Sequence, residues 1–438
     1  MVLLLSLAAC ATAAPPPPAP LDAWLRQATG DGGYLGAVAV VADHDRVVYR
    51  GASGHADLEG RQPLREDAIF RIYSMTKPVT SVAALMLVEQ GRLGLDDPVA
   101  KYLPAFARMQ RVVGGDVDAP QLVPVAGTLT VRHLLTHTAG FATGGDDIRV
   151  ASALLQRQAP EEAADLAGYA DRVAHAPLAG EPGTRFRYDG VNTEVLARVI
   201  EVASGEPFAR FLQARILSPL GMRDSGFEVP VAQRGRVMAL TSRDTAGRRL
   251  LADTPSAKTP GVPLRAYTSG AGGLYSTADD YLRFARMLVN GGELDGTRLL
   301  QQDTVAMMMT DQLAAFDPAV PAPEPGEGFG LGGYVVTDPA KSARPGSRGQ
   351  FGWSGAASTY FTIDPTRHLV IVLMSQHLPV DGAPALPKLA GPFYRQVYTA
   401  VPALVMATPR RTPGGRTDRT AWAARARRPR AGAATSAR

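Results

Sequence analysis

The chain has 438 residues, of which 45% are hydrophobic, and this composition excludes a wholly disordered protein. Its single cysteine excludes an internal disulfide framework and a zinc finger or ribbon. The net charge of +5 is uneven, because residues 409–438 contain nine arginines and one aspartate, a balance of +8, which leaves the other 408 residues at −3. We expect this basic tail to be disordered, and we expect no nucleic-acid partner because no other feature of nucleic-acid recognition accompanies it.

Residues 1–20 have the features of an export leader followed by a tether. Residues 2–9 form a short apolar run, and Leu7-Ala8-Ala9-Cys10 matches a bacterial lipobox, in which the cysteine is lipidated. The four prolines at 15–18 would form a stiff spacer. We expect an exported protein, either anchored to a membrane through a lipidated Cys10 or free in the periplasm or the medium. The alternative is an ordinary signal peptide with an incidental cysteine.

Residues 21–408 are expected to form one domain. Residues 34–52 predict two strands joined by a tight turn, and residues 74–90 predict a helix with Pro78 in its first turn, where the missing N–H group is not needed. The following segment, roughly residues 95–260, has helical periodicity interrupted by loops rich in Gly and Pro. Its clearest predicted helices are 130–137, 161–174, 192–204 and 207–217.

The last third of the chain predicts one more long helix, a loop and a group of strands. Ser276 is a good N-cap for a helix over 276–290, and the proline-rich residues 311–328 predict a long loop. Because strands precede and follow the helical segment, we predict an α/β (α+β) fold, in which an antiparallel sheet built from both chain ends is flanked by helices and interrupted by a mainly helical insert. The late strands are predicted at 331–337, 349–354, 357–363 and 368–375, before a final helix around 386–400.

Ser74 and Lys77 are three residues apart at a predicted helix start, so their side chains share one helix face. A serine becomes a nucleophile when a base or cation lies beside it, and a partly desolvated lysine can fill that role. The positive end of the helix dipole would also favour an oxyanion there. Ser-x-x-Lys alone is common by chance, and the alternative is a capping serine beside a surface lysine.

Two further segments contain residues suited to a hydrolytic site. Tyr188 lies in a loop just before the helix predicted over 192–204; such a tyrosine is either a packing residue or an acid–base group whose pKa Lys77 lowers. Residues 350–358 read Gln-Phe-Gly-Trp-Ser-Gly-Ala-Ala-Ser between strand patterns, and their glycines would let the backbone approach a ligand closely.

Together these segments resemble the serine β-lactamase and penicillin-binding-protein superfamily, and within it the class C β-lactamase-like carboxylesterases, also called family VIII esterases. The resemblance extends over roughly residues 22–400. Six phrases carry it in the family's order: RIYSMTK at 71–77, LTVRHLLTHTAGF at 129–141, PGTRFRYDG at 182–190, SPLGM at 218–222, SGAGGLYSTADDYLRFARML at 269–288 and QFGWSGAAS at 350–358.

The resemblance implies a role for each motif. Ser74 would be the acylated nucleophile, and Lys77 would hold Tyr188 as a phenolate or share its proton. Tyr188 would be the general base for attack and for the deacylating water. The backbone N–H groups of Ser74 and Ala356 would form the oxyanion hole. The resemblance implies neither a metal nor an organic cofactor.

The departures from the family pattern concern the substrate. Trp353 stands where β-lactamases and D,D-peptidases have a lysine that pairs with the substrate carboxylate, while Ser354 and Gly355 keep the rest of that motif. A tryptophan offers a flat apolar surface and cannot pair with a carboxylate, which favours an uncharged ester. Gly190 replaces the asparagine that β-lactamases have two residues after the tyrosine, and Asn192 is near enough to take over that substrate contact.

Three functions therefore remain. The first is an exported serine carboxylesterase, the second is a β-lactamase or D,D-carboxypeptidase, and the third is a non-catalytic binding protein with the same fold. Residues 352–356 lack the last glycine of a G-x-S-x-G elbow, which excludes an α/β-hydrolase. His133 and His137 are four apart without the glutamate of a zinc protease, so we interpret them as structural. Among the histidines, His377 is the one candidate to test as an acid–base group.

Overall fold

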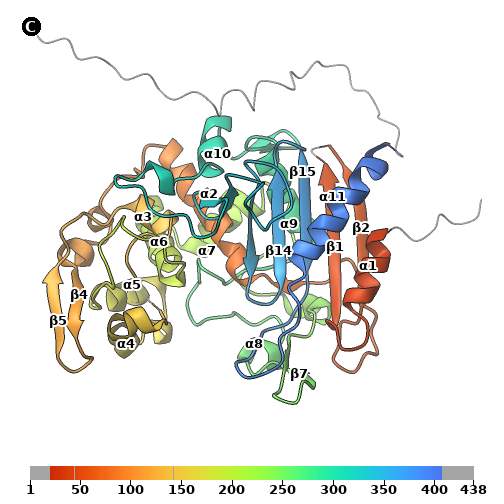
Figure 1. Cartoon of the computed structure of the whole chain (residues 1–438), viewed down its shortest axis with the longest axis horizontal. Coiled ribbons are helices and arrows are strands. Elements are labelled where there is room, and N and C mark those ends of the chain that lie inside the picture. The colour runs from red at the N-terminus through yellow and green to blue at the C-terminus, as the bar shows by residue number, and fades with distance from the viewer. Residues whose placement is uncertain (1–19, 44, 142, 407–438) are drawn as a thin grey trace, which may run out of the picture.

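The structure is a computed structural model that describes residues 20–43, 45–141 and 143–406 (Figure 1). The predictions made for Cys10 and for residues 409–438 fall outside these ranges. Within the ranges, no helix combines the length and the apolar character that crossing a bilayer requires.

A seven-stranded antiparallel sheet is built from both ends of the described chain (Figure 1). The strand order β11-β12-β13-β14-β15-β1-β2 places the first two strands beside the last one. This arrangement confirms the predicted fold class, including the pairing of the two chain ends. The strands are β1 (Gly36–Asp43), β2 (Val47–Gly54), β11 (Glu327–Phe329), β12 (Tyr334–Val336), β13 (Phe351–Gly355), β14 (Thr359–Asp364) and β15 (Leu369–Met374).

The central strands of the sheet are buried on both faces because helices cover each side. Along β1, Val40 points into one hydrophobic core and Val41 into the other, as the two-residue period of a strand requires. Helices α1 (Pro20–Ala28) and α11 (Ala390–Met406) close the core of Val41, and α9 (Ala278–Val289) packs on the opposite face. Strands buried on both faces read as continuous apolar runs, and β1 and β15 do so.

Helix α2 (Thr76–Glu89) runs through the larger core and packs against α6 (Gly190–Ser204). Every residue from Thr76 to Leu87 is buried, so the helix has no polar stripe. The sequence predicts that this helix begins at Ser74. In the structure a 3₁₀ turn over Tyr73–Met75 comes first, and the α-helix follows from Thr76.

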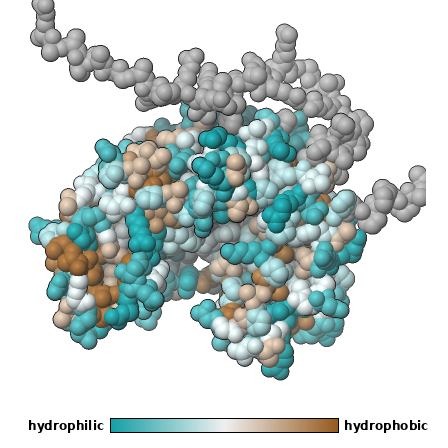
Figure 2. All heavy atoms as spheres, in the orientation of Figure 1, coloured by the Kyte–Doolittle hydropathy of each residue, from teal (hydrophilic) through white to brown (hydrophobic). Residues whose placement is uncertain are grey.

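The segment between β2 and β11 holds the predicted helices and three hairpins that periodicity missed, the third of which joins β9 (Glu293–Leu294) and β10 (Thr297–Arg298). The β4–β5 hairpin (Gln110–Gly115 and Pro120–Pro124) turns at Asp116, whose carboxylate accepts two backbone N–H groups. Its strands are mostly half-exposed and lack apolar alternation, and Val113 is 48% exposed. Hydrophobic residues gather over this part of the surface in Figure 2. The second hairpin joins β6 (Thr241–Arg243) and β7 (Arg249–Leu251). The helices are α3 (Val131–Leu135), α4 (Arg149–Arg157), α5 (Leu166–Ala174), α7 (Phe208–Leu212) with a π-helical turn over Gln213–Leu217, and α8 (Pro255–Lys258).

The predicted N-cap of the helix at 276–290 is wrong by one residue. Ser276 belongs to β8 (Tyr275–Ser276), which pairs with β3 (Phe70–Arg71), so its backbone stays extended. Thr277 caps α9 instead, with its hydroxyl accepting from the Asp280 N–H at 3.1 Å. The segment after α9 adds β9 (Glu293–Leu294), β10 (Thr297–Arg298) and α10 (Gln302–Met308), and the predicted loop over 311–328 contains one 3₁₀ turn, Leu313–Ala315, and the start of β11.

Candidate functional site

Ser74 lies at the start of α2, in a turn that the surrounding strands hold in place. Strand β3 leads into this turn, and the Arg71 N–H donates to the Gln376 side chain at 3.0 Å. Tyr73, the residue before Ser74, has a φ of +43°, a left-handed conformation that is costly for a residue other than glycine. Backbone strain of this kind persists where tertiary contacts enforce it, and it marks this turn as a candidate site.

Lys77 is buried beside Ser74, with 3% of its surface exposed. Its ammonium donates to the Ser74 hydroxyl at 3.1 Å and to the Ala271 carbonyl at 2.8 Å. The three-residue spacing therefore brings the two side chains together as the sequence predicts. A buried cation in contact with a hydroxyl stabilises negative charge that develops on the oxygen.

Tyr188 lies across the site from Ser74, in the loop that precedes α6. The Lys77 ammonium is 4.9 Å from the centre of the Tyr188 ring. Burial raises the pKa of Tyr188, but the Lys77 charge and hydrogen bonds with neighbouring side chains together lower it further, so that it lies below its usual value of 10. Those bonds involve Lys77, Ser74 and Trp353, whose indole N–H is 3.4 Å from the phenol oxygen. The structure thus unites the three predicted catalytic side chains.

His137, which the sequence predicts to be structural, packs against Tyr188, with 4.8 Å between the ring centres. Its carbonyl accepts the Arg187 N–H at 2.8 Å, and its ring Nδ1 accepts the Asp189 N–H at 3.2 Å. Burial and the charge of Lys77 lower its pKa to about 3, so the ring stays neutral and Nδ1 remains an acceptor. His137 therefore holds the backbone on both sides of Tyr188. The sequence signal was its place in the phrase LLTHTAGF.

The segment 350–358 contains β13, which contacts the turn that carries Ser74. A side chain on Gly355 would have its Cβ 2.2 Å from the Ile72 carbonyl oxygen, so only glycine permits this approach. The approach brings the end of β13 beside the turn that carries Ser74, and Ala356 is the next residue along the chain. Ser354 is exposed, and Trp353 is half-buried.

Trp353 belongs to a group of aromatic side chains around Tyr188. Its ring centre is 4.9 Å from that of Tyr188 and 5.2 Å from that of Phe329. Phe186 and Phe316 complete the same hydrophobic cluster. Phe316 comes from the 311–328 loop, which therefore packs against this side of the site. The result is an apolar wall beside a polar group of serine, lysine and tyrosine.

Asn192 lies in the first turn of α6 and is 1% exposed. Its side-chain N–H donates to the Asp189 carbonyl at 3.2 Å, while its buried Oδ1 has no hydrogen-bond partner among the described residues. The substrate contact expected of Asn192 therefore stays a prediction, and its amide N–H is already used within the helix start.

The other two histidines that the sequence analysis singled out have partners away from Ser74. His133 caps α3 through Thr130 and stacks on Phe316 at 5.4 Å, and burial lowers its pKa to about 4. His377 lies 3.3 Å from the Thr241 hydroxyl, and burial lowers its pKa to about 4 as well. Among the described residues, no three His, Cys, Asp or Glu side chains are grouped to hold a metal.

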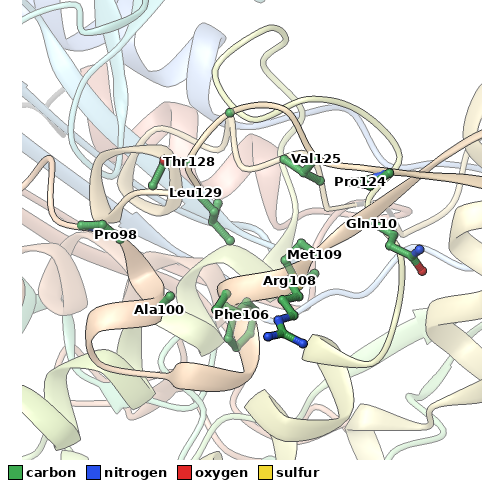
Figure 3. A pocket seen from close by; sticks show the side chains of 12 residues that line it. Pro98, Ala100, Phe106, Arg108, Met109, Gln110, Pro124, Val125, Thr128 and Leu129 are labelled. Atoms are coloured by element: carbon green, nitrogen blue, oxygen red, sulfur yellow. The ribbon is translucent and has the colours of Figure 1, made fainter.

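A cavity of about 450 Å³ lies apart from this site, at the base of the β4–β5 hairpin (Figure 3). Phe106, Met109, Val125 and Leu129 line it together with Arg108. Its lining contains no serine, histidine or carboxylate, and the hydroxyl of Thr128 has no histidine, lysine or carboxylate among the other lining residues to serve as its base.

The chain is similar to a known protein family, to bacterial relatives and to solved structures. Residues 21–390 match the family model described as Beta-lactamase. Protein Rv1367c of Mycobacterium tuberculosis (strain ATCC 25618 / H37Rv) is 34% identical over 395 residues, which cover 88% of this chain and 97% of that protein. Esterase EstB of Burkholderia gladioli is 33% identical over 377 residues, covering 82% and 90%. Among solved structures, EstCE1, described as a hydrolase with promiscuous acyltransferase activity, has a TM-score of 0.67 and 28% identity, covering 87% of this chain and 97% of its own.

Proposed function

Because the chain belongs to the β-lactamase family, we propose that it is a serine hydrolase that forms an acyl-enzyme on Ser74 and acts on uncharged short-chain esters. The observation that supports this proposal most directly is the contact of one buried ammonium, Lys77, with both the Ser74 hydroxyl and the Tyr188 ring. A nucleophile, a cation and a base with a lowered pKa are the parts that an acyl-transfer site needs.

In the proposed mechanism, Ser74 Oγ attacks the ester carbonyl while the Tyr188 phenolate takes its proton. The backbone N–H groups of Ser74 and Ala356 donate to the oxyanion of the tetrahedral intermediate, and each such donor contributes about two to three orders of magnitude in rate. Tyr188 then protonates the alcohol as it departs, and the acyl group stays bound to Ser74 Oγ as the acyl-enzyme. Tyr188 next takes a proton from a water molecule, whose oxygen attacks the acyl carbonyl. When this second intermediate collapses, Tyr188 returns the proton to Ser74 Oγ, which releases the acid and restores both the serine hydroxyl and the phenolate.

The wall formed by Trp353 supports the choice of substrate. The indole offers an apolar surface and one N–H, which already faces Tyr188, so it has no charge to pair with a substrate carboxylate. The two cations on the Tyr188 loop, Arg185 and Arg187, both pair with Asp147. EstB, one of the similar proteins, is named an esterase, and this name favours the same substrate class.

Two alternatives remain as outcomes to be tested. A β-lactamase or D,D-carboxypeptidase would need another cation to bind the substrate carboxylate. A non-catalytic binding protein would leave Ser74 unreactive toward every acylating reagent, although its three catalytic side chains are in contact.

The first experiment compares two substrates on purified protein. We expect p-nitrophenyl butyrate to be hydrolysed with a kcat/KM at least about a hundredfold above that for a chromogenic cephalosporin. The site offers an apolar wall, and the cations named among its described residues, Lys77, Arg185 and Arg187, already have partners. Trapping with the ester followed by mass spectrometry should find the acyl group on the peptide that contains Ser74. Efficient cephalosporin turnover would favour the β-lactamase, and the absence of any acylation would favour the binding protein.

A substitution at Trp353 tests the carboxylate argument. Trp353→Lys should raise kcat/KM for an ester carrying a carboxylate about tenfold relative to its neutral analogue, because a hydrogen bond to a charged group contributes about 1.5–3 kcal/mol. Trp353→Met is the matched control, since it removes the indole without adding a charge. If both variants show the same preference between the two esters, the lysine position has been assigned wrongly.

A further inference from the structure

Glu194 is a buried carboxyl group close to the site that the proposed mechanism does not use. It lies on α6, six residues after Tyr188, and 4% of its surface is exposed. Among the described ion pairs none involves Glu194. Burying a carboxylate without a contacting cation is costly, so its hydrogen-bond partners should show what it does.

Both partners of Glu194 belong to the loop that carries the Lys77 acceptor. One carboxylate oxygen accepts the Ser269 hydroxyl, and the other accepts the Gly270 N–H at 2.8 Å. The Ser269 oxygen in turn accepts the Gly272 N–H at 3.0 Å. The Ser269 hydroxyl gives its one proton to the Glu194 carboxylate, so its oxygen acts as the acceptor for the Gly272 N–H on the far side of Ala271. Glu194 therefore fixes the backbone both before and after Ala271.

The fixed segment presents its central carbonyl to the catalytic lysine. Ala271 O accepts from Lys77 Nζ at 2.8 Å, while the neighbouring Gly270 carbonyl accepts the Thr80 hydroxyl at 2.7 Å. On another side, Thr268 and Gly273 border a cavity of about 610 Å³. The position of the Ala271 carbonyl thus depends on these hydrogen bonds.

The charged and phenolic groups around Glu194 come from α2, from α5 and from the segments that carry Glu161 and Tyr267. Lys77 on α2 is the one cation among them, while Glu161, Tyr169 of α5 and Tyr267 interact with the carboxyl group as acidic or phenolic groups. Burial raises the pKa of Glu194 to about 7, against the opposing effects of the Ser269 bond and the Lys77 charge.

We propose that Glu194 is a positioning residue for the catalytic lysine: through Ser269 and Gly270 it holds the Ala271 carbonyl against the Lys77 ammonium and so keeps that ammonium between Ser74 and Tyr188. This inference rests on the proposed function, because it assigns Lys77 a role in activating Ser74. Without Glu194, the Ser269 hydroxyl and the Gly270 N–H lose the carboxylate oxygens that accept from them. The Ala271 carbonyl is then no longer fixed against the Lys77 ammonium, and Tyr188 loses part of the positive charge that favours its phenolate.

The test uses a reagent that needs no knowledge of the natural substrate. A fluorophosphonate phosphonylates an activated serine with loss of fluoride, and mass spectrometry of the full-length protein gives the rate at Ser74 between pH 5 and 10. Glu194→Leu, which removes both acceptors, should slow labelling at pH 7 about tenfold or more and move the acid limb of the pH profile to higher pH. Glu194→Gln keeps one acceptor and should fall between Glu194→Leu and the wild type.

Glu201→Leu on the same helix is the matched control, because Glu201 also accepts a backbone N–H, from Phe208, and lies outside the site. It should lower the melting temperature without moving the acid limb. A folded Glu194→Leu with a rate within twofold of wild type and an unmoved limb would overturn the proposal; if that variant does not fold, Ser269→Ala is judged by the same two criteria. Wild-type protein that is labelled but cleaves no ester would contradict the substrate class alone, whereas unlabelled wild-type protein would overturn both proposals.

Discussion

Ser74→Ala is expected to reduce ester hydrolysis by about four to six orders of magnitude, to the residual rate that binding and the oxyanion hole supply without a nucleophile. The proposed pathway has one covalent intermediate, and alanine cannot form it. The Lys77 ammonium would keep its bond to the Ala271 carbonyl, so the fold should be retained. The measurement is kcat/KM on a nitrophenyl ester, together with the loss of fluorophosphonate labelling.

Ser81→Ala is the matched control for this substitution, since Ser81 is also on α2 and is 2% exposed. It should retain wild-type activity within a few-fold. Ester cleavage by Ser74→Ala at more than about one per cent of the wild-type rate would mean that another residue or an activated water attacks the substrate.

Lys77→Met is expected to lower kcat at neutral pH by about two to four orders of magnitude, which is the usual contribution of a positioned acid–base system. In the wild type the Lys77 charge contributes to a Tyr188 pKa below its usual value, so the phenolate is available above that lowered pKa and is lost as the pH falls through it. Without the ammonium, burial still raises the Tyr188 pKa and only the hydrogen bonds with Ser74 and Trp353 lower it, so this pKa should be higher than in the wild type. The acid limb of the kcat profile should therefore move to higher pH, and residual activity should increase up to pH 10.

Lys101→Met provides the control, because Lys101 is an exposed lysine that pairs with Asp97 and contacts none of the catalytic side chains named above. Its profile should match that of the wild type. A Lys77→Met enzyme that loses rate while its acid limb stays in place would show that Lys77 acts on Ser74 directly rather than through Tyr188.

The sequence predicted the parts of the site that depend on short spacing. Ser74 and Lys77 are three residues apart on one helix, so their contact follows from helix geometry. The sheet was also predictable, because β1 and β15 are buried on both faces and read as continuous apolar runs. The β4–β5 hairpin was missed because its half-exposed strands have no such alternation.

Contacts between distant segments could not be read from the sequence. His137 holds the backbone around Tyr188 across 52 positions, and the Lys77 ammonium meets the Ala271 carbonyl across 194. The direction of the Asn192 side chain is another example: its amide N–H donates back to the Asp189 carbonyl, which its position in sequence did not indicate. Spacing along a chain does not determine which way a side chain points.

By itself, the sequence determined the fold class, the family resemblance and the Ser74–Lys77 pair, because each rests on local periodicity or on a short motif. Only the tertiary structure decided how the lysine is held, since the Glu194 carboxylate, the Ser269 hydroxyl and the Ala271 carbonyl come together only when α6 packs against α2. The physical reason is that a buried polar group must find its partners wherever folding places them, and those partners are set by packing rather than by order along the chain.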